Sequence, residues 1–118
     1  TVRTEIDGVA IVLANMHLTH TDPRLARTEL EKAVAFIEKR GNSSTPVLLG
    51  GDLNLAEPDD PAFSRLSTQG FSQPGAGIDH LLGRTIKPVR PPAPVAEHER
   101  DGVRLSDHPV IEAEFELA

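Results

Sequence analysis

The chain has 118 residues, with 12 lysines and arginines against 18 aspartates and glutamates, which gives a formal net charge of −6 at pH 7. This length allows one small domain or part of a larger one. The acidic balance argues against broad electrostatic binding to nucleic acid, although it does not exclude one locally basic groove. The absence of cysteine excludes disulfides, thiolate metal ligands and thiol nucleophiles, and no apolar run approaches the ~18 residues that a transmembrane helix needs.

The N-terminal residues predict a β-hairpin. Residues 1–6 alternate between polar and apolar side chains, and residues 7–8 (Asp-Gly) are typical of a two-residue hairpin turn. Residues 9–18 are strongly apolar, which indicates a central strand that is buried on both faces.

A helix and a second buried strand are expected next. Residues 22–23 (Asp-Pro) form a good helix start, because aspartate caps the first turn and proline fits the first helical position. Gly41 is expected to close this helix. The apolar face of the helix repeats at helical spacing, through Leu30, Ala33, Val34 and Ile37. Residues 47–49 predict a short buried strand that ends in Gly-Gly-Asp.

The second half of the chain predicts a shorter helix and further strands. A helical turn is expected at residues 62–66, a loop at 70–77 and a short strand at 78–82. Four prolines within residues 85–100 predict an edge strand and an extended loop, while residues 109–117 alternate apolar and acidic side chains like a half-exposed strand. This order of elements predicts an α/β fold with mixed strand directions.

Four polar clusters lie at the ends of the predicted strands, at residues 15–17, 52–54, 79–80 and 106–108. Because each cluster begins or follows an apolar strand, one edge of a packed sheet could collect all four. We therefore expect the functional site at that edge.

Asp52 and Asn54 are the first candidate pair. Two residues apart on an extended segment, their side chains point the same way and could hold a water molecule or a divalent metal. The alternative is a turn in which both side chains bond their own backbone, a role for which these residue types are also favoured.

The other candidates are an aspartate and histidines. Asp79 lies in an apolar strand, where a carboxylate needs a partner, and His108 is the expected one; the alternative is an edge strand whose aspartate faces water. Asp107 could be a metal or water ligand or plain loop surface. His17 could belong to the site, or be a core side chain bonded to a backbone carbonyl. His80 should point away from Asp79 and be structural or line the rim of the site.

Taken together and in order, the motifs N-x-H-L, G-D-L-N, I-D-H and S-D-H-P resemble the endonuclease/exonuclease/phosphatase superfamily, which includes pancreatic-type deoxyribonucleases, apurinic-site endonucleases, neutral sphingomyelinases and inositol polyphosphate phosphatases. The resemblance runs from about Val9 to Leu117 and corresponds to the C-terminal half of the family's domain. It implies half of a four-layer α/β/β/α sandwich, a mixed β-sheet with a covering helix. Residues 1–118 would be that C-terminal half, with the N-terminal half absent.

The resemblance also implies catalytic roles. Asp52 resembles the residue that orients or deprotonates the attacking water, and Asn54 the group that positions this water or the phosphate. His108 matches the histidine that contacts the scissile phosphate, with Asp79 as its carboxylate partner. His17 matches a second histidine on the phosphate. The implied activity is metal-dependent hydrolysis of a phosphodiester or phosphomonoester by a carboxylate-activated water.

The implied metal is Mg²⁺ or Mn²⁺, because hard oxygen ligands dominate and thiolates are absent. Asp107 resembles the acidic residue near the metal, and Asp52 and Asn54 are the other candidate ligands. The family's principal metal-binding glutamate belongs to the N-terminal half. We therefore expect the isolated chain to bind Mg²⁺ weakly and to hydrolyse little, whereas the parent enzyme would be active.

The substrate class stays open between nucleic acid, a phospholipid headgroup and a small phosphoester. The acidic balance makes a large DNA footprint less attractive, and the basic strip Arg84, Lys87 and Arg90 could meet phosphate or be solvated edge charge. The alternative function is a non-catalytic family member that binds a phosphorylated ligand or a protein partner. In an incomplete sandwich one sheet face would be uncovered, so we expect self-association of the chain through that face.

Overall fold

A four-stranded mixed sheet forms the centre of the protein in the computed structural model, which describes residues 1–96 and 99–117. Its strands lie in the order β1-β2-β3-β4. Their bounds are Val2–Ile6, Val9–His17, Val47–Asp52 and Asp79–Arg84. β2 and β3 are parallel, whereas the two outer pairs are antiparallel. The predicted hairpin, the central position of the second strand and the mixed strand directions are confirmed.

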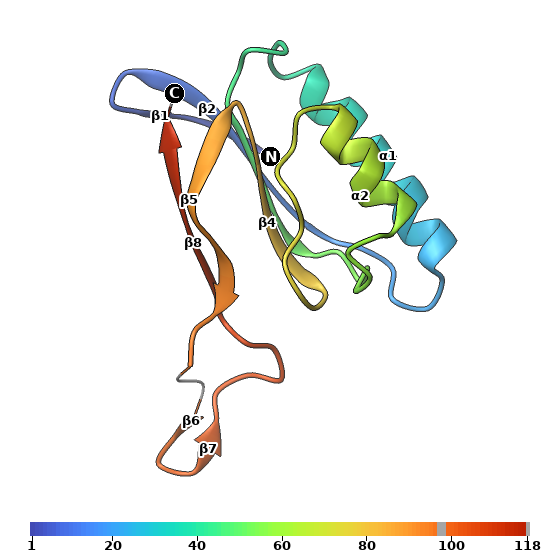
Figure 1. The fold of residues 1–118 in the computed structure, drawn as a ribbon, viewed down its shortest axis with the longest axis vertical. Helices are drawn as coiled ribbons and strands as arrows, with labels where there is room; N and C mark the ends of the chain where they lie inside the picture. The colour runs from blue at the N-terminus through green and yellow to red at the C-terminus, as the bar shows by residue number, and fades with distance from the viewer. Residues whose placement is uncertain (97–98, 118) are drawn as a thin grey trace.

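Two helices in the described part of the chain cover one face of this sheet (Figure 1). α1 (Pro23–Glu38) crosses over between the parallel strands β2 and β3, and α2 (Pro61–Thr68) precedes β4. The predicted start of α1 is confirmed, because the Asp22 carboxylate accepts a hydrogen bond from the Arg24 N–H. Asp60 caps α2 in the same way.

α1 ends at Glu38 with Lys39 as its C-cap, two residues before Gly41, which was expected to close it. The N–H groups of Lys39 and Arg40 instead bond back to carbonyls three residues earlier, which tightens the last turn of the helix. Gly41 has no positive φ. A β-carbon at this position would lie 2.7 Å from the Thr45 hydroxyl, so glycine is explained by the close approach of the next turn.

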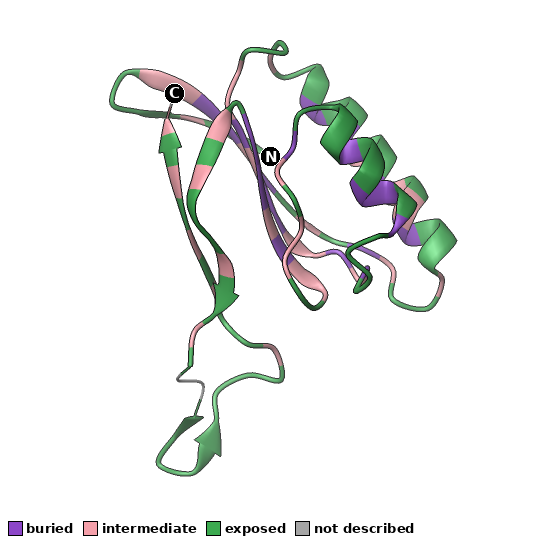
Figure 2. Cartoon of the chain, viewed as in Figure 1, coloured by how far each residue is buried: buried purple, intermediate pink, exposed green. Residues whose placement is uncertain are grey.

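The core lies between the helices and the sheet (Figure 2). Val12, Leu49 and Leu82 from β2, β3 and β4 are at most 1% exposed, and Leu30 and Ile37 meet them from α1. The opposite face of the sheet is only partly covered: Leu13 and Leu48 are half-buried and border hollows of about 420 and 340 Å³. The expectation that β2 is buried on both faces is therefore wrong for this side.

An antiparallel ribbon of β5 (Ile86–Pro94) and β8 (Ile111–Leu117) lies on the side away from the helices (Figure 1). It touches the sheet at Gly83, where an added β-carbon would lie 2.7–3.0 Å from Ile86 and Phe115. The prolines of β5 are tolerated because the strand pairs on one side and has register shifts. The alternating exposure of β8 is confirmed.

A small hairpin of β6 (Glu99–Arg100) and β7 (Val103–Arg104) projects from the end of this ribbon (Figure 1). The edge strand expected within residues 85–100 is β5, and the extended loop after it contains β6. Residues 97–98 lie outside the described part of the chain. Neither helix is long and apolar enough to cross a membrane within the described residues.

Candidate active site

Three of the predicted site residues form one row across the end of the sheet. His17 at the end of β2 is paired in register with Asp52 at the end of β3, and Asp52 is paired with Asp79 at the start of β4. Cross-strand partners project from the same face of a sheet, so the three side chains leave it together. The Nε2 atom of His17 lies 3.4 Å from Oδ2 of Asp52.

His108 reaches this row from the segment between β7 and β8. Its Nδ1 lies 2.8 Å from Oδ2 of Asp79, and its Nε2 lies 3.9 Å from Oδ2 of Asp52. The N–H of His108 donates to the Ser106 hydroxyl, which fixes the local turn. The predicted pairing of Asp79 with His108 is confirmed, and the alternative of an aspartate that faces only water is wrong.

The hydrogen bond that His108 donates to Asp79 raises the pKa of His108 above its ordinary value, and the negative charge of Asp79 adds to this effect. Desolvation opposes the rise, and the charges of Asp107 and Asp52 contribute smaller increases. His108 is therefore charged over a wider pH range than a free histidine. The bond also fixes the proton on Nδ1 in the neutral form, which leaves Nε2 facing Asp52.

Asp52 and Asn54 form a turn at the end of β3. The N–H of Asn54 donates to Oδ1 of Asp52, with Asn54 in the left-handed conformation (φ 49°) that asparagine tolerates. Its side-chain amide donates to the Leu18 carbonyl at 2.7 Å, which ties this turn to the end of β2. The turn is therefore confirmed for Asp52, whereas the Asn54 side chain bonds Leu18 rather than its own backbone. That the pair holds a water molecule or a metal stays a prediction.

Gly51 is required where β3 meets β2. It has a φ of 130°, and a β-carbon at this position would lie 1.9 Å from the Met16 carbonyl oxygen. No side chain fits there. The glycine lets β3 continue beside β2 as far as Asp52, so that its carboxylate stands next to His17.

Asp52, Asp79 and His108 could hold a metal ion, because one ligand atom from each lies within 4.8 Å of the others. Oδ2 of Asp79 and Nδ1 of His108 are already bonded to each other. Oδ2 of Asp52 is farther from both histidines than a charge-assisted hydrogen bond requires, so it keeps its capacity as a ligand. These residues fit a cation that is held mainly through Asp52 and completed by water and phosphate, a mode typical of Mg²⁺.

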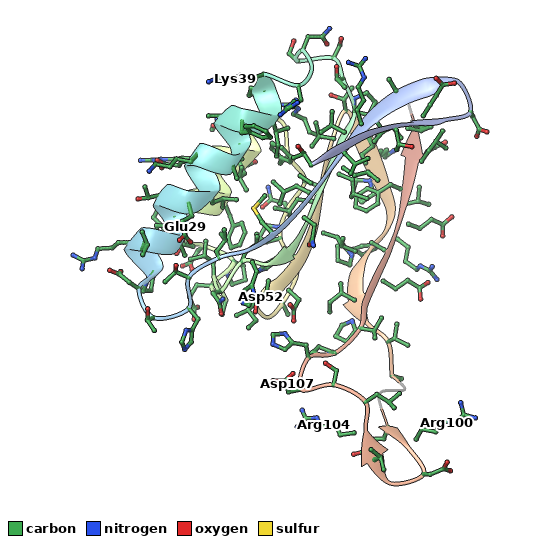
Figure 3. All side chains as sticks on the ribbon, turned by 180° about the vertical axis from the view of Figure 1, so that it is seen from behind. Glu29, Lys39, Asp52, Arg100, Arg104 and Asp107 are labelled. Carbon is green, nitrogen blue, oxygen red and sulfur yellow. The ribbon has the colours of Figure 1, made fainter. Side chains whose placement is uncertain are left out.

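The structure brings Asp107 to the same end of the molecule as Asp52 (Figure 3) but leaves it exposed and outside the group of possible ligands among the described residues. Its role near a metal stays a prediction. His17 is not a core residue, since its side chain is 77% exposed. His80 lies on the opposite face of β4 from Asp79, as expected, and is buried rather than on the rim.

Arg84, Lys87 and Arg90 do not form one exposed basic strip, because only Lys87 and Arg90 are exposed. Arg84 is buried, pairs with Glu38 of α1 and lies over the Phe71 ring, so it is neither a phosphate ligand nor solvated edge charge. Arg90 on β5 pairs with Glu112 on β8. Lys87 and Arg90 are exposed on β5, so the alternative of solvated edge charge holds for these two residues.

Glu29 of α1 was not expected to affect the site. Its carboxylate accepts hydrogen bonds from both the N–H and the hydroxyl of Thr19, at 2.8 and 2.7 Å, and thereby fixes the loop that follows His17. These bonds lower the pKa of Glu29. The sequence shows Glu29 only as a polar position on the helix, because its partner lies ten residues away in a loop.

A further hollow, of about 590 Å³, lies between α1 and α2. Its floor is aliphatic, and of the charged residues around it Glu31 pairs with Arg65 while Glu38 pairs with Arg84. No group of metal-ligating side chains lies in it among the described residues. The ends of β2, β3 and β4 are therefore a better candidate for the active site than this hollow.

No family model matches the sequence, and no curated protein matches it. Among solved structures, a functionally unknown conserved protein from Enterococcus faecalis V583 aligns over 98% of this chain and 52% of its own, with a TM-score of 0.71 and 19% identity. A beta toxin from Staphylococcus aureus aligns over 95% of this chain and 55% of its own (TM-score 0.64, 16% identity).

An endonuclease/exonuclease/phosphatase family protein from Bacteroides thetaiotaomicron aligns over 91% of this chain and 46% of its own, with a TM-score of 0.64 and 15% identity. The chain shares the fold of this family protein. It spans about half the length of each of the three structures. The fold expected from the four motifs, half of an α/β sandwich with a mixed sheet, is thus confirmed.

Proposed function

We propose that the chain is the C-terminal half of a metal-dependent phosphoesterase domain of the endonuclease/exonuclease/phosphatase superfamily. The observation that carries the proposal is the grouping of Asp52, His17 and His108, with Asp79 behind His108, at one sheet end. A general base next to two imidazoles suits attack of water on a phosphate, whose negative charge must be neutralised as the bond forms.

In this proposal Asp52 accepts a proton from the attacking water. Its side chain is 15% exposed, so water can reach it, and the bond from the Asn54 N–H to Oδ1 holds its orientation. His108 carries a proton on Nε2 when it is cationic and offers it to a phosphoryl or leaving oxygen. Asp79 keeps His108 cationic and oriented, because it bonds Nδ1 and raises the pKa.

The proposed cofactor is Mg²⁺ or Mn²⁺. Asp52 would hold it, with Asp79, Asn54 and Asp107 as further candidates, and when bound it would supply Lewis-acid stabilisation of the charge on the phosphoryl oxygens. The proposed substrate is a phosphoester, whether nucleic acid, a phospholipid headgroup or a small ester. We also propose that the remaining ligands and half of the sandwich come from a second, N-terminal half, so that the isolated chain has little activity.

The test is Asp52→Asn in the full-length protein, with Mg²⁺ and bis-p-nitrophenyl phosphate as the substrate. We expect kcat to fall about 10²–10⁴-fold, the usual contribution of a general base. Asp59→Asn is the matched control, because Asp59 is exposed in the loop before α2 and lies outside the site. Unchanged hydrolysis by the Asp52 variant would overturn the proposal, and tight binding of phosphate without hydrolysis by the unmodified protein would favour the non-catalytic alternative.

A further inference from the structure

We propose that His80 is a positioning residue that holds the turn carrying Asp52 from the far face of the sheet; this inference rests on the proposed function. The His80 side chain is 2% exposed and packs against Phe63, with ring centroids 4.9 Å apart. Its Nε2 lies 2.8 Å from the Leu55 carbonyl oxygen. Because a carbonyl only accepts hydrogen bonds, Nε2 carries the proton and donates it.

Packing alone does not explain a histidine at this position. Nδ1 of His80 is buried without a hydrogen-bond partner among the described residues. An unpartnered buried nitrogen is unfavourable, and an aliphatic or aromatic side chain would fill the same space without it. The useful property of the imidazole here is therefore the bond from Nε2 to Leu55.

Leu55 directly follows the turn of residues 52–54 in which Asp52 is held. At the start of the turn, the Asp52 carbonyl accepts from the Leu18 N–H and the Leu53 N–H donates to Ile78. In its middle, Asn54 bonds both Oδ1 of Asp52 and the Leu18 carbonyl. The bond from His80 fixes the carbonyl of the next residue, Leu55, so the backbone is held before and after the turn.

The dipeptide 79–80 thereby supports both sides of the site. Asp79 projects from one face of β4 and orients His108, whereas His80 projects from the other face and holds Leu55. A small displacement of Asp52 relative to His108 would slow the reaction, because proton transfer depends on their placement to within about 1 Å.

The experiment compares His80→Gln with His80→Met in the full-length protein. The two side chains have nearly the same shape, but only glutamine offers an N–H near the position of Nε2. With bis-p-nitrophenyl phosphate, we expect His80→Met to lose about 10–100-fold in kcat with KM within about twofold, and His80→Gln to retain most of the activity. If the methionine variant does not fold, His80→Asn replaces it, because its amide is too short to reach Leu55.

A second readout does not depend on catalysis. Loss of the His80 bond should raise the hydrogen-exchange rate of the Asn54 N–H about tenfold in His80→Met but not in His80→Gln. Phe63→Leu is the control for loss of packing: it removes a contact with His80 but leaves the Leu55 bond, so it should lower Tm with kcat unchanged.

Three results would overturn the inference: full kcat and unchanged exchange in His80→Met, equal losses in the glutamine and methionine variants, or an equal loss of kcat in Phe63→Leu. Failure of the proposed function would look different. In that case Asp52→Asn would leave hydrolysis unchanged. If Asp52→Asn lowers kcat but His80→Met does not, only the positioning role of His80 is rejected.

Discussion

The placement of His17, Asp52 and Asp79 depends on strand register. The three residues are direct cross-strand neighbours, so a slip of one residue in either pairing would turn one of them toward the helices. The register is fixed by the helix-facing leucines and valines of the same strands, which are at most 1% exposed at Val12, Leu49 and Leu82. Packing of the core thus determines which polar groups meet at the strand ends.

The contact between Asp79 and His108 can be tested without metal or substrate. Asp79→Asn removes the negative charge and the strong acceptor that raise the pKa of His108. We expect the pKa of His108 to fall toward the ordinary value of histidine, about 6.5. An NMR titration of the His108 ring signals in metal-free protein measures this shift.

The raised pKa of His108 also makes the stability of the fold depend on pH. Because the folded-state pKa of His108 is raised, the pair stabilises the fold most below the unfolded pKa, and this contribution is lost as pH rises through the folded pKa. Asp59→Asn changes the charge of an exposed residue outside the site and should leave the His108 titration unaltered. A His108 pKa that does not move in Asp79→Asn would show that the 2.8 Å contact is not maintained in solution.

The polar residues were predicted from the sequence to different degrees. The contact between Asp79 and His108 could be expected, because a carboxylate in an apolar strand needs a cationic or donor partner. The burial of Arg84 could not, since its partners Glu38 and Phe71 come from α1 and from a loop, and only the packing of these elements brings them together. The bond from His80 to Leu55 is equally non-local.

At the level of elements, Asp60 joins the two helices. It caps α2 through the Ala62 N–H, and its carboxylate bonds Arg27 of α1 at 2.8–3.1 Å while remaining 7% exposed. We expect Asp60→Ala to lower the free energy of unfolding by about 2–3 kcal/mol, from a lost cap and a lost charge-assisted bond. Asp60→Asn keeps the cap and should cost about 1–2 kcal/mol. Urea unfolding at pH 6 measures both.

The difference between the native protein and Asp60→Asn should depend on pH. The bond from Arg27 holds the pKa of Asp60 below its ordinary value, so the stabilisation is fully present above the unfolded pKa of about 4 and is lost as pH falls through the folded pKa. The two proteins should therefore be closer in stability at pH 3 than at pH 6. An equal difference at both values would exclude a role of the Asp60 charge.

The elements with strong local signals were predicted best. α1 has an Asp-Pro start and a clear apolar face, and the structure places it at Pro23–Glu38. The β6–β7 hairpin was missed, although its turn, residues 101–102, is an Asp-Gly pair with both φ angles positive. Its strands have two residues each and bury nothing, so no hydrophobic pattern marks them.

At the scale of the whole molecule, the sheet has one well-covered and one poorly covered face. Helices pack on the first, whereas the second carries the half-buried Leu13, Leu48 and Leu81 beside open hollows. The three solved structures of the same fold are about twice as long as this chain. Exposed aliphatic surface of this kind favours association, so the isolated chain should cover this face with another copy of itself.

Leu48→Lys tests this expectation, because Leu48 borders both hollows on the poorly covered face. Burying a lysine charge in an interface is unfavourable, so the variant should sediment mainly as a monomer where the native chain forms dimers or larger species. Leu25→Lys is the matched control: Leu25 lies on α1, is 46% exposed and should leave association unchanged. Sedimentation velocity at several concentrations separates these cases. A native chain that is monomeric throughout, or a Leu25 variant that dissociates as readily as the Leu48 variant, would show that this sheet face does not drive association.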